Sequence, residues 1–337
     1  MPTRLSRRVK VASGLLTAAL CLACPRPAAA VVINTATAGT LNSTAPANDP
    51  GWDNVGYFGI GTAIYLGDRW GLTAYHNLGS PNLVLGETSY ALVPGSEVRL
   101  TNANQVVADM MLFRLAADPG LPSLSLATTR PVHGSPLVVI GAGHRQIDGL
   151  VHWSSTWQVV ESGGTYAGYH SSNTHFKRWG TNSIEPASPS TPDADATVGT
   201  GYGTVKAFYT HFDDIPGNTN ECDAVFGDSG AAAFYERAGA WELAGMVVAV
   251  SRFAGQGSDD AVFGDHTFYA DISVYQPQIA AIMAPEPAMP LLTSLIAAAS
   301  LASRFRTRRP GRSPRPTPRQ PADAAAARVR ARRAPVP

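Results

Sequence analysis

The sequence predicts an all-β protein, a barrel or a sandwich, with one short helix after its last strand. Its apolar segments are short, rich in β-branched and aromatic residues, and separated by turn-forming residues, as in antiparallel strands. Glycine and proline, 32 and 26 of the 337 residues, recur throughout and break the chain into such segments. Helical periodicity is nearly absent before Val274, where "VYQPQIAAIM" predicts a helix over residues 274–283.

The expected strands follow one another along most of the chain. No internal repeat is visible, which argues against a solenoid. The clearest strand segments are residues 61–66, 90–93, 96–100, 137–140, 157–160, 204–209 and 246–250.

The formal net charge of +1 hides a separation of charge along the chain. Residues 31–283 hold 10 Lys and Arg against 23 Asp and Glu, whereas residues 304–337 hold 11 arginines and a single acid, Asp323. Because a nucleic-acid surface must be basic, the acidic body argues against nucleic acid as a partner.

Residues 1–30 are typical of a secretory signal peptide. Basic residues precede an apolar core over 11–24, and small residues at 28–30 suit cleavage by signal peptidase after Ala30. Two of the three cysteines lie in this segment, so only Cys222 would remain and no intramolecular disulfide could form. We expect the stability of the mature domain to come from its hydrophobic core.

Neither a metal nor a cofactor is expected. A thiolate metal site would need a second cysteine, and we expect His170 and His175, in a Ser/Asn-rich stretch, to be solvated loop residues. Residues 48–54 are rich in Asn and Asp; a turn is the favoured interpretation and a calcium loop is the alternative.

The residues most indicative of function are three that could form one catalytic group. Ser229 stands between glycines in "GDSG", where a sharply turned backbone would expose its hydroxyl. Serine is a weak nucleophile that needs a positioned base, usually a histidine held by a third group. His76 follows one apolar segment and Asp109 opens another, so the order along the chain is His, Asp, Ser.

Four segments resemble trypsin-like serine proteases in the order of that family. "WGLTAYHN" resembles the histidine motif, "ADMMLFRL" the aspartate motif and "FGDSGA" the serine motif, and "WELAGMVVAV" is similar to the strand that lines the substrate cleft. The resemblance covers roughly residues 31–283. It implies two six-stranded antiparallel β-barrels, over about 31–130 and 135–272, followed by a short C-terminal helix.

The resemblance also implies an activity, that of a secreted or cell-surface serine endopeptidase acting on a protein or peptide. Ser229 would attack the peptide carbonyl, His76 would act as the base, and Asp109 would orient the imidazole. The N–H groups of Gly227 and Ser229 would form the oxyanion hole, and Asp228 would anchor that loop by pairing with a buried cation. The alternative is a catalytically silent, surface-displayed homologue that acts as a binding or matrix protein.

The cation that would pair with Asp228 has more than one candidate. Cleavage after Ala30 would expose the amine of Val31 in an apolar segment that lacks the two glycines of trypsins. An internal arginine, such as Arg130 or Arg145, is the other candidate.

The resemblance places Asp223, Val248 and Val250 in the substrate pocket. A carboxylate at Asp223, six residues before Ser229, would favour Arg or Lys in the substrate. Val250 could narrow the entrance instead, so the preference stays open.

The C-terminal segment resembles a PEP-CTERM sorting signal of exopolysaccharide-producing Gram-negative bacteria. A Pro-Glu-Pro box at 285–287 precedes an apolar run over 289–302 and an arginine cluster that ends at Arg309. Residues 284–309 would then be processed by an exosortase-like sorting protease, leaving the protein at the cell surface, outer envelope or matrix. The apolar run would be a transmembrane helix and the sole membrane contact, although a spanning helix usually needs about 20 residues. Residues 310–337, rich in Pro, Ala and Arg, are expected to be disordered.

Overall fold

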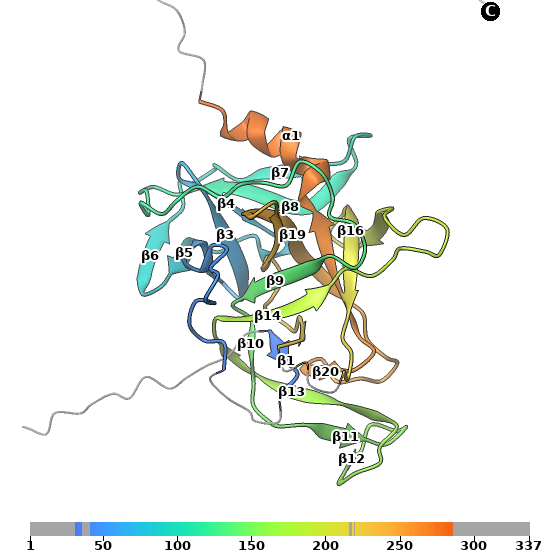
Figure 1. The fold of residues 1–337 in the computed structure, drawn as a ribbon. Coiled ribbons are helices and arrows are strands. Elements are labelled where there is room, and N and C mark those ends of the chain that lie inside the picture. The colour runs from blue at the N-terminus through green and yellow to red at the C-terminus, as the bar shows by residue number, and fades with distance from the viewer. Residues whose placement is uncertain (1–30, 36–40, 216–217, 219, 286–337) are drawn as a thin grey trace, which may run out of the picture. The chain divides into compact units, whose positions relative to one another are not determined.

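A computed structural model describes residues 31–35, 41–215, 218 and 220–285. Figure 1 shows these residues as a set of antiparallel sheets followed by one helix, α1 (Ile272–Met283). The predicted all-β class is confirmed, and two of the sheets form the two barrels expected from the resemblance.

The first barrel contains seven strands in the order β6-β5-β2-β3-β4-β8-β7. A bridge between Leu92 and Leu115 joins the ends of β6 and β8, so six strands close into a ring and β7 pairs with β8 outside it. These strands are β2 (Val55–Phe58), β3 (Gly61–Gly67), β4 (Trp70–Thr73), β5 (Asn82–Leu85), β6 (Thr88–Ala91), β7 (Val98–Thr101) and β8 (Val107–Arg114).

The second barrel is built the same way, in the order β14-β9-β18-β19-β21-β16-β15. A bridge between Ile184 and Thr210 joins β14 to β16 and closes six strands, while β15 pairs with β16. The strands are β9 (Pro136–Gly141), β14 (Arg178–Ser183), β15 (Ala196–Gly199), β16 (Thr204–His211), β18 (Ala232–Arg237), β19 (Ala240–Val250) and β21 (His266–Asp271).

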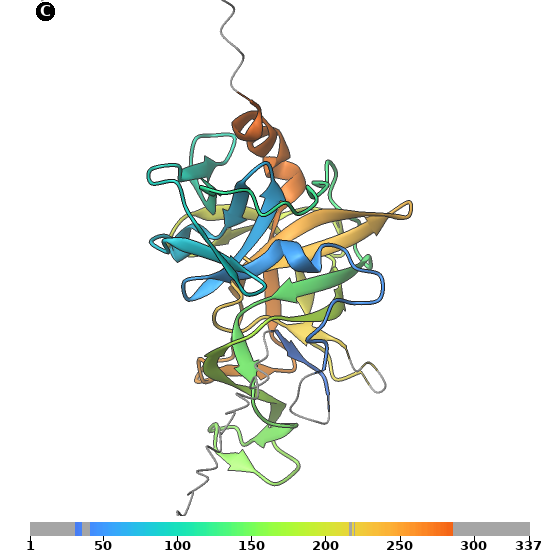
Figure 2. The same ribbon diagram turned by 90° about the vertical axis from the view of Figure 1, so that its left-hand side faces the viewer.

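Smaller elements surround these barrels. A hairpin that carries β11 and β12 projects on the side opposite α1 in both ribbon views (Figures 1 and 2). The remaining elements are β1 (Val32–Ile33), β10 (His144–Gln146), β11 (Val151–Trp153), β12 (Val159–Val160), β13 (Tyr166–His175), β17 (Cys222–Asp223), β20 (Asp260–Val262) and the 3-10 turns η1 (Trp52–Asn54) and η2 (Tyr75–Asn77).

Strand β3 shows how the barrels pack against each other, because all seven of its residues are buried. Ile64 and Leu66 belong to a core cluster that also contains second-barrel residues and α1. Ala63 and Tyr65 point the other way, into a cluster made of first-barrel residues. Alternate side chains of one strand therefore contribute to two cores. Each fully buried large apolar side chain stabilises the fold by about 1.5–3 kcal/mol.

Two sequence expectations about histidines are wrong. His170 and His175 lie in β13 and not in a solvated loop. His170 Nδ1 is hydrogen-bonded to Asp260 of the neighbouring β20, and this bond raises the pKa of the histidine. Because β13 is rich in polar residues, its sequence suggested a loop, although the structure shows a strand.

The turn interpretation of residues 48–54 agrees with the structure. The Asp49 carboxylate accepts the N–H groups of Gly51 at 2.8 Å and Trp52 at 2.6 Å, which begins the 3-10 turn η1. This carboxylate oxygen therefore serves the local backbone.

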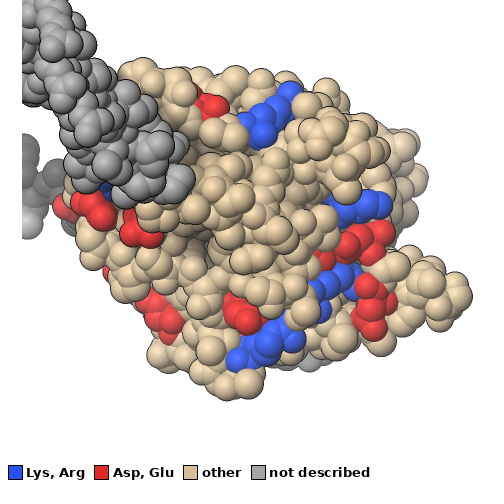
Figure 3. Space-filling view, turned by 90° about the horizontal axis from the view of Figure 1, so that it is seen from above, with Lys and Arg blue, Asp and Glu red and all other residues tan. Residues whose placement is uncertain are grey.

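The surface charges of the described residues are dispersed on the face drawn in Figure 3. Small groups of Lys and Arg and of Asp and Glu lie next to one another on the right of that view, and much of the remaining surface is uncharged. In the part of the chain that the structure describes, no helix is long and apolar enough to cross a membrane.

Candidate active site

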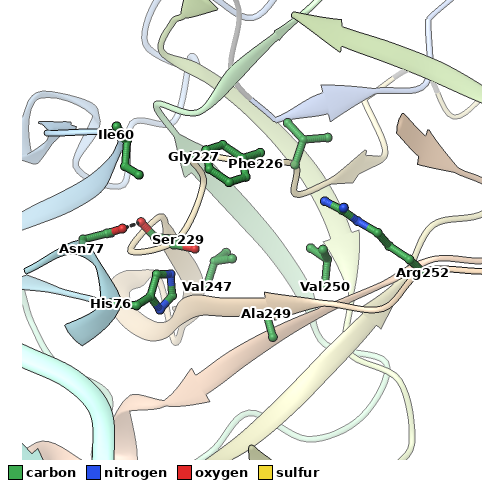
Figure 4. A pocket seen from close by; sticks show the side chains of 11 residues that line it. Ile60, His76, Asn77, Phe226, Gly227, Ser229, Val247, Ala249, Val250 and Arg252 are labelled. Carbon is green, nitrogen blue, oxygen red and sulfur yellow. Dashed lines mark hydrogen bonds between the residues drawn. The ribbon is translucent and has the colours of Figure 1, made fainter. Parts of the chain in front are cut away.

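One pocket brings together residues that lie far apart in the sequence. His76 comes from η2 in the first barrel, and Ser229 lies in the loop between β17 and β18. Figure 4 shows both side chains on the same side of this pocket, with Arg252 across from them. The lining is Ile60, His76, Asn77, Val225, Phe226, Gly227, Ser229, Val247, Ala249, Val250 and Arg252.

His76 is held by Asp109 through two contacts. Its Nδ1 lies 2.8 Å from Oδ2 of Asp109, and its backbone N–H donates to Oδ1 at 3.0 Å. Burial by itself raises the pKa of the fully buried Asp109, but hydrogen bonds from His76 and Thr200 outweigh it and hold the pKa below its usual value. Because an ionised carboxylate only accepts, Nδ1 carries the hydrogen and Nε2 keeps its lone pair on the opposite side of the ring.

A loop of the second barrel covers this pair, and sequence reasoning missed it. Thr200, between β15 and β16, donates its side-chain hydrogen bond to Asp109. The ring centroid of Tyr202 lies 5.5 Å from that of His76. A Cβ on Gly203 would meet the backbone of residues 107–109 at 2.7–3.0 Å, so the loop packs directly on the first barrel. No local pattern marks Thr200, because its partner is distant in the sequence.

The backbone of the Ser229 loop is fixed by the first barrel. Gly227 and Gly230 have φ values of 87° and 90°, which glycine adopts without strain. The carbonyl of Gly227 accepts the Thr62 hydroxyl at 2.9 Å, and the carbonyl of Ser229 accepts the Thr62 N–H at 2.9 Å and the Asn77 amide at 2.8 Å. Asn77 thus joins the turn that carries His76 to the Ser229 loop.

The N–H groups of Gly227 and Ser229 remain open to a ligand. Within the described residues neither group donates to the protein, whereas Asp228 N–H binds Val225 O and Gly230 N–H binds Val247 O. Among the described residues, no hydrogen bond joins the Ser229 hydroxyl to His76.

Asp228 is completely buried behind the Ser229 loop. It accepts the N–H groups of Gly143 and Val225, each at 2.9 Å, and the N–H of Val31. Burial raises the pKa of Asp228 to about 7, and the neighbouring cation is Arg178.

The internal cation near Asp228 differs from both arginines expected from the sequence. Arg130 pairs instead with Asp195 at 3.2 Å, and Arg145 lies near enough to Arg178 to oppose its charge. Arg178 is fully buried and donates to Val31 O at 3.4 Å and to Gln146 Oε1 at 2.7 Å. The other candidate, Val31, is fully buried beside the same carboxylate.

The structure places only one of the three expected pocket residues in the lining. Val250 lines the pocket, but Val248 is 2% exposed and packs into the core shared by the two barrels. Asp223 is also 2% exposed; it accepts the Thr267 hydroxyl at 2.6 Å, and burial raises its pKa well above the usual value. Asp223 is therefore absent from the lining of this pocket, and its carboxylate is hydrogen-bonded to Thr267.

No family model and no curated protein matches this chain. Among solved structures, it matches neuropsin, a serine protease expressed in the limbic system of mouse brain, at 19% identity and a TM-score of 0.41, covering 67% of this chain and 89% of that one. It matches kallikrein-related peptidase 10 in complex with Zn²⁺ at 16% identity and a TM-score of 0.42, covering 72% of this chain and 99% of that one. It matches the NS6 protease of murine norovirus 1 at 13% identity and a TM-score of 0.37, covering 73% of this chain and 97% of that one. Likenesses of this size do not establish the activity of this chain.

Proposed function

We propose that the protein is a serine endopeptidase that hydrolyses peptide bonds through His76, Asp109 and Ser229. The observation that carries the proposal is the 2.8 Å contact between His76 Nδ1 and the buried Asp109 carboxylate, in a pocket that also contains Ser229. An imidazole fixed in this tautomer is the base that a serine nucleophile requires.

The proposed reaction proceeds through an acyl-enzyme. Ser229 Oγ bonds to the peptide carbonyl carbon while its proton moves to Nε2 of His76. The resulting oxyanion accepts the free N–H groups of Gly227 and Ser229, each donor lowering the barrier by about 3–4 kcal/mol. His76 then gives the proton to the leaving amine. A water molecule bonds to the acyl carbon while His76 takes its proton, and His76 returns that proton to Ser229 Oγ as the bond between Oγ and the acyl carbon breaks.

The test is hydrolysis of an unstructured protein substrate by the full domain and its variants. We expect Ser229→Ala and His76→Ala each to lose nearly all turnover while the unfolding midpoint stays close to that of the unmodified protein, because the triad acts as a unit. Ser162→Ala, at an exposed serine outside the pocket, is the matched control and should retain full activity. A folded, inactive parent protein would favour the silent surface-displayed homologue.

We also propose that the protein is exported and sorted. Signal peptidase would cleave after Ala30, and an exosortase-like protease would cleave near the Pro-Glu-Pro box, leaving the domain at the surface, envelope or matrix of a Gram-negative bacterium. The signal peptide, the proposed transmembrane run and the tail lie outside the described residues, and α1 ends at Met283, just before the box. The intact mass of the protein from a host with the sorting machinery tests this: a chain from Met1 to Pro337 refutes both cleavages.

A further inference from the structure

We infer that the pocket beside Ser229 accepts an acidic side chain of the substrate, Glu or Asp, and that Arg252 is the residue that recognises its carboxylate. The inference rests on the proposed endopeptidase function and names the substrate class of that site. It reverses the preference for Arg or Lys that Asp223 suggested from the sequence.

The charge of the pocket lining carries this inference. Among the lining residues, Arg252 is the only Lys, Arg, Asp or Glu. It follows β19 by two residues, and Figure 4 shows its guanidinium end directed toward the part of the pocket that holds Phe226 and Ser229. A cation across the pocket from the nucleophile, with no Asp or Glu in the lining, attracts a carboxylate and repels a basic side chain.

Arg252 is available to bind a ligand. Among the described residues its guanidinium has no hydrogen bond and no ion pair within 4.0 Å, and the side chain is exposed. An arginine with a free planar group of N–H donors can hold a carboxylate through two parallel hydrogen bonds.

Two buried acids of this region, Asp223 and Asp265, have hydrogen-bond partners outside the pocket lining. Asp223 faces Thr267, as described above. Asp265 accepts the Gln256 amide at 2.6 Å and the Val262 N–H at 2.9 Å; burial raises its pKa to about 6, while the charge of Arg252 partly opposes that rise. Neither carboxylate lines the pocket, and among the described residues neither forms an ion pair with Arg252 within 4.0 Å.

The rest of the lining suits the aliphatic part of such a side chain. Val247, Ala249 and Val250 form an apolar wall on β19 between the Ser229 side and Arg252 (Figure 4). The methylene groups of Glu would pack on this wall while its carboxylate reaches the guanidinium. Gln has the same size and shape as Glu without the charge. The ratio of kcat/KM for a Glu peptide to that for a Gln peptide therefore isolates the role of Arg252.

The test compares peptides that differ only at the residue before the scissile bond: Glu, Gln or Arg. We expect kcat/KM for Glu to exceed that for Gln by about 10- to 100-fold, the range of a charge-assisted hydrogen bond. Arg252→Ala should bring this Glu to Gln ratio of kcat/KM close to one, and Arg252→Lys should keep part of the preference for Glu. Arg252→Glu should favour the Arg peptide. Arg237→Ala, at a half-buried arginine that pairs with Glu242 outside the pocket, should leave the ratio of the two kcat/KM values unchanged.

A binding measurement separates this inference from the proposed activity. Product peptides that end in Glu or Gln are titrated into the Ser229→Ala protein and into Ser229→Ala combined with Arg252→Ala. We expect a preference for Glu that the second substitution removes. Equal affinity for the two peptides, or a Glu preference that survives loss of Arg252, overturns the inference even where the parent protein is an active peptidase. If the parent protein does not hydrolyse peptides, tighter binding of the Glu peptide that depends on Arg252 still supports the recognition site. In that case only the proposed peptidase activity is refuted.

Discussion

A single extra residue before Val31 should change how the stability of this protein depends on pH. In the structure Val31 offers Asp228 a backbone N–H, and burial raises the pKa of that carboxyl from 3.8 to about 7. A chain that begins at Val31 would place a charged α-amine at the same position, which favours the ionised carboxylate and lowers its pKa.

The magnitude follows from the pKa difference between folded and unfolded chains. A folded pKa above the unfolded value means that stability is fully present below about pH 4 and is lost as the pH rises through about 7. A difference of about three pKa units corresponds to a loss of about 4 kcal/mol. We expect the chain with one extra residue to show this loss, and the chain that begins at Val31 to show much less of it.

Urea unfolding of the two chains between pH 4 and pH 8 measures this difference. Other buried carboxylates with raised pKa values, such as Asp195 and Asp265, are common to both chains and cancel in the comparison. Asp228→Asn in both chains is the control and should make their pH profiles coincide. Identical profiles and identical peptidase activity without that substitution would refute the role of the amine and leave Arg178 as the partner of Asp228.

Three further substitutions probe the supports of the site. Thr200→Val removes the hydroxyl that binds Asp109, and we expect kcat to fall about tenfold with KM nearly unchanged, as steady-state kinetics would show. Thr62→Val leaves two buried backbone groups without a partner, and urea unfolding should show a loss of about 2–4 kcal/mol. Gly230→Ala would bring a Cβ to 2.0 Å from the Thr62 carbonyl oxygen and should prevent a stable fold, whereas Gly239→Ala, with open space around it, should cost only about 1–2 kcal/mol by thermal unfolding.

The sequence was sufficient for features that depend on neighbouring residues. The apolar runs around β3, β9 and β16 predicted strands because short segments rich in β-branched and aromatic residues, bounded by turn residues, form a local pattern. The helix begins at Ile272, two residues before the expected start, because the Asp271 carboxylate caps it through the Ser273 N–H at 2.8 Å. The motifs around His76, Asp109 and Ser229 were also recognisable locally, and the fold brings His76 into contact with Asp109 and into one pocket with Ser229.

The features that the sequence did not reveal depend on distant contacts. Asp223 lies at the expected distance from Ser229 in the chain, but the pairing of β17 with β1 buries its side chain against Thr267. Arg178 approaches Val31 from 147 residues away, and no local pattern distinguishes it from Arg130 or Arg145. Arg252 enters the pocket only because β19 ends beside it.

The location of a fluorophosphonate adduct tests the central claim most directly. The account predicts one adduct per folded protein, found on the peptide that contains Ser229, and almost no labelling in the His76→Ala variant, because only a serine activated by that imidazole reacts quickly. A folded protein that stays unlabelled, or an adduct on another serine, would contradict the claim that His76, Asp109 and Ser229 form a catalytic triad.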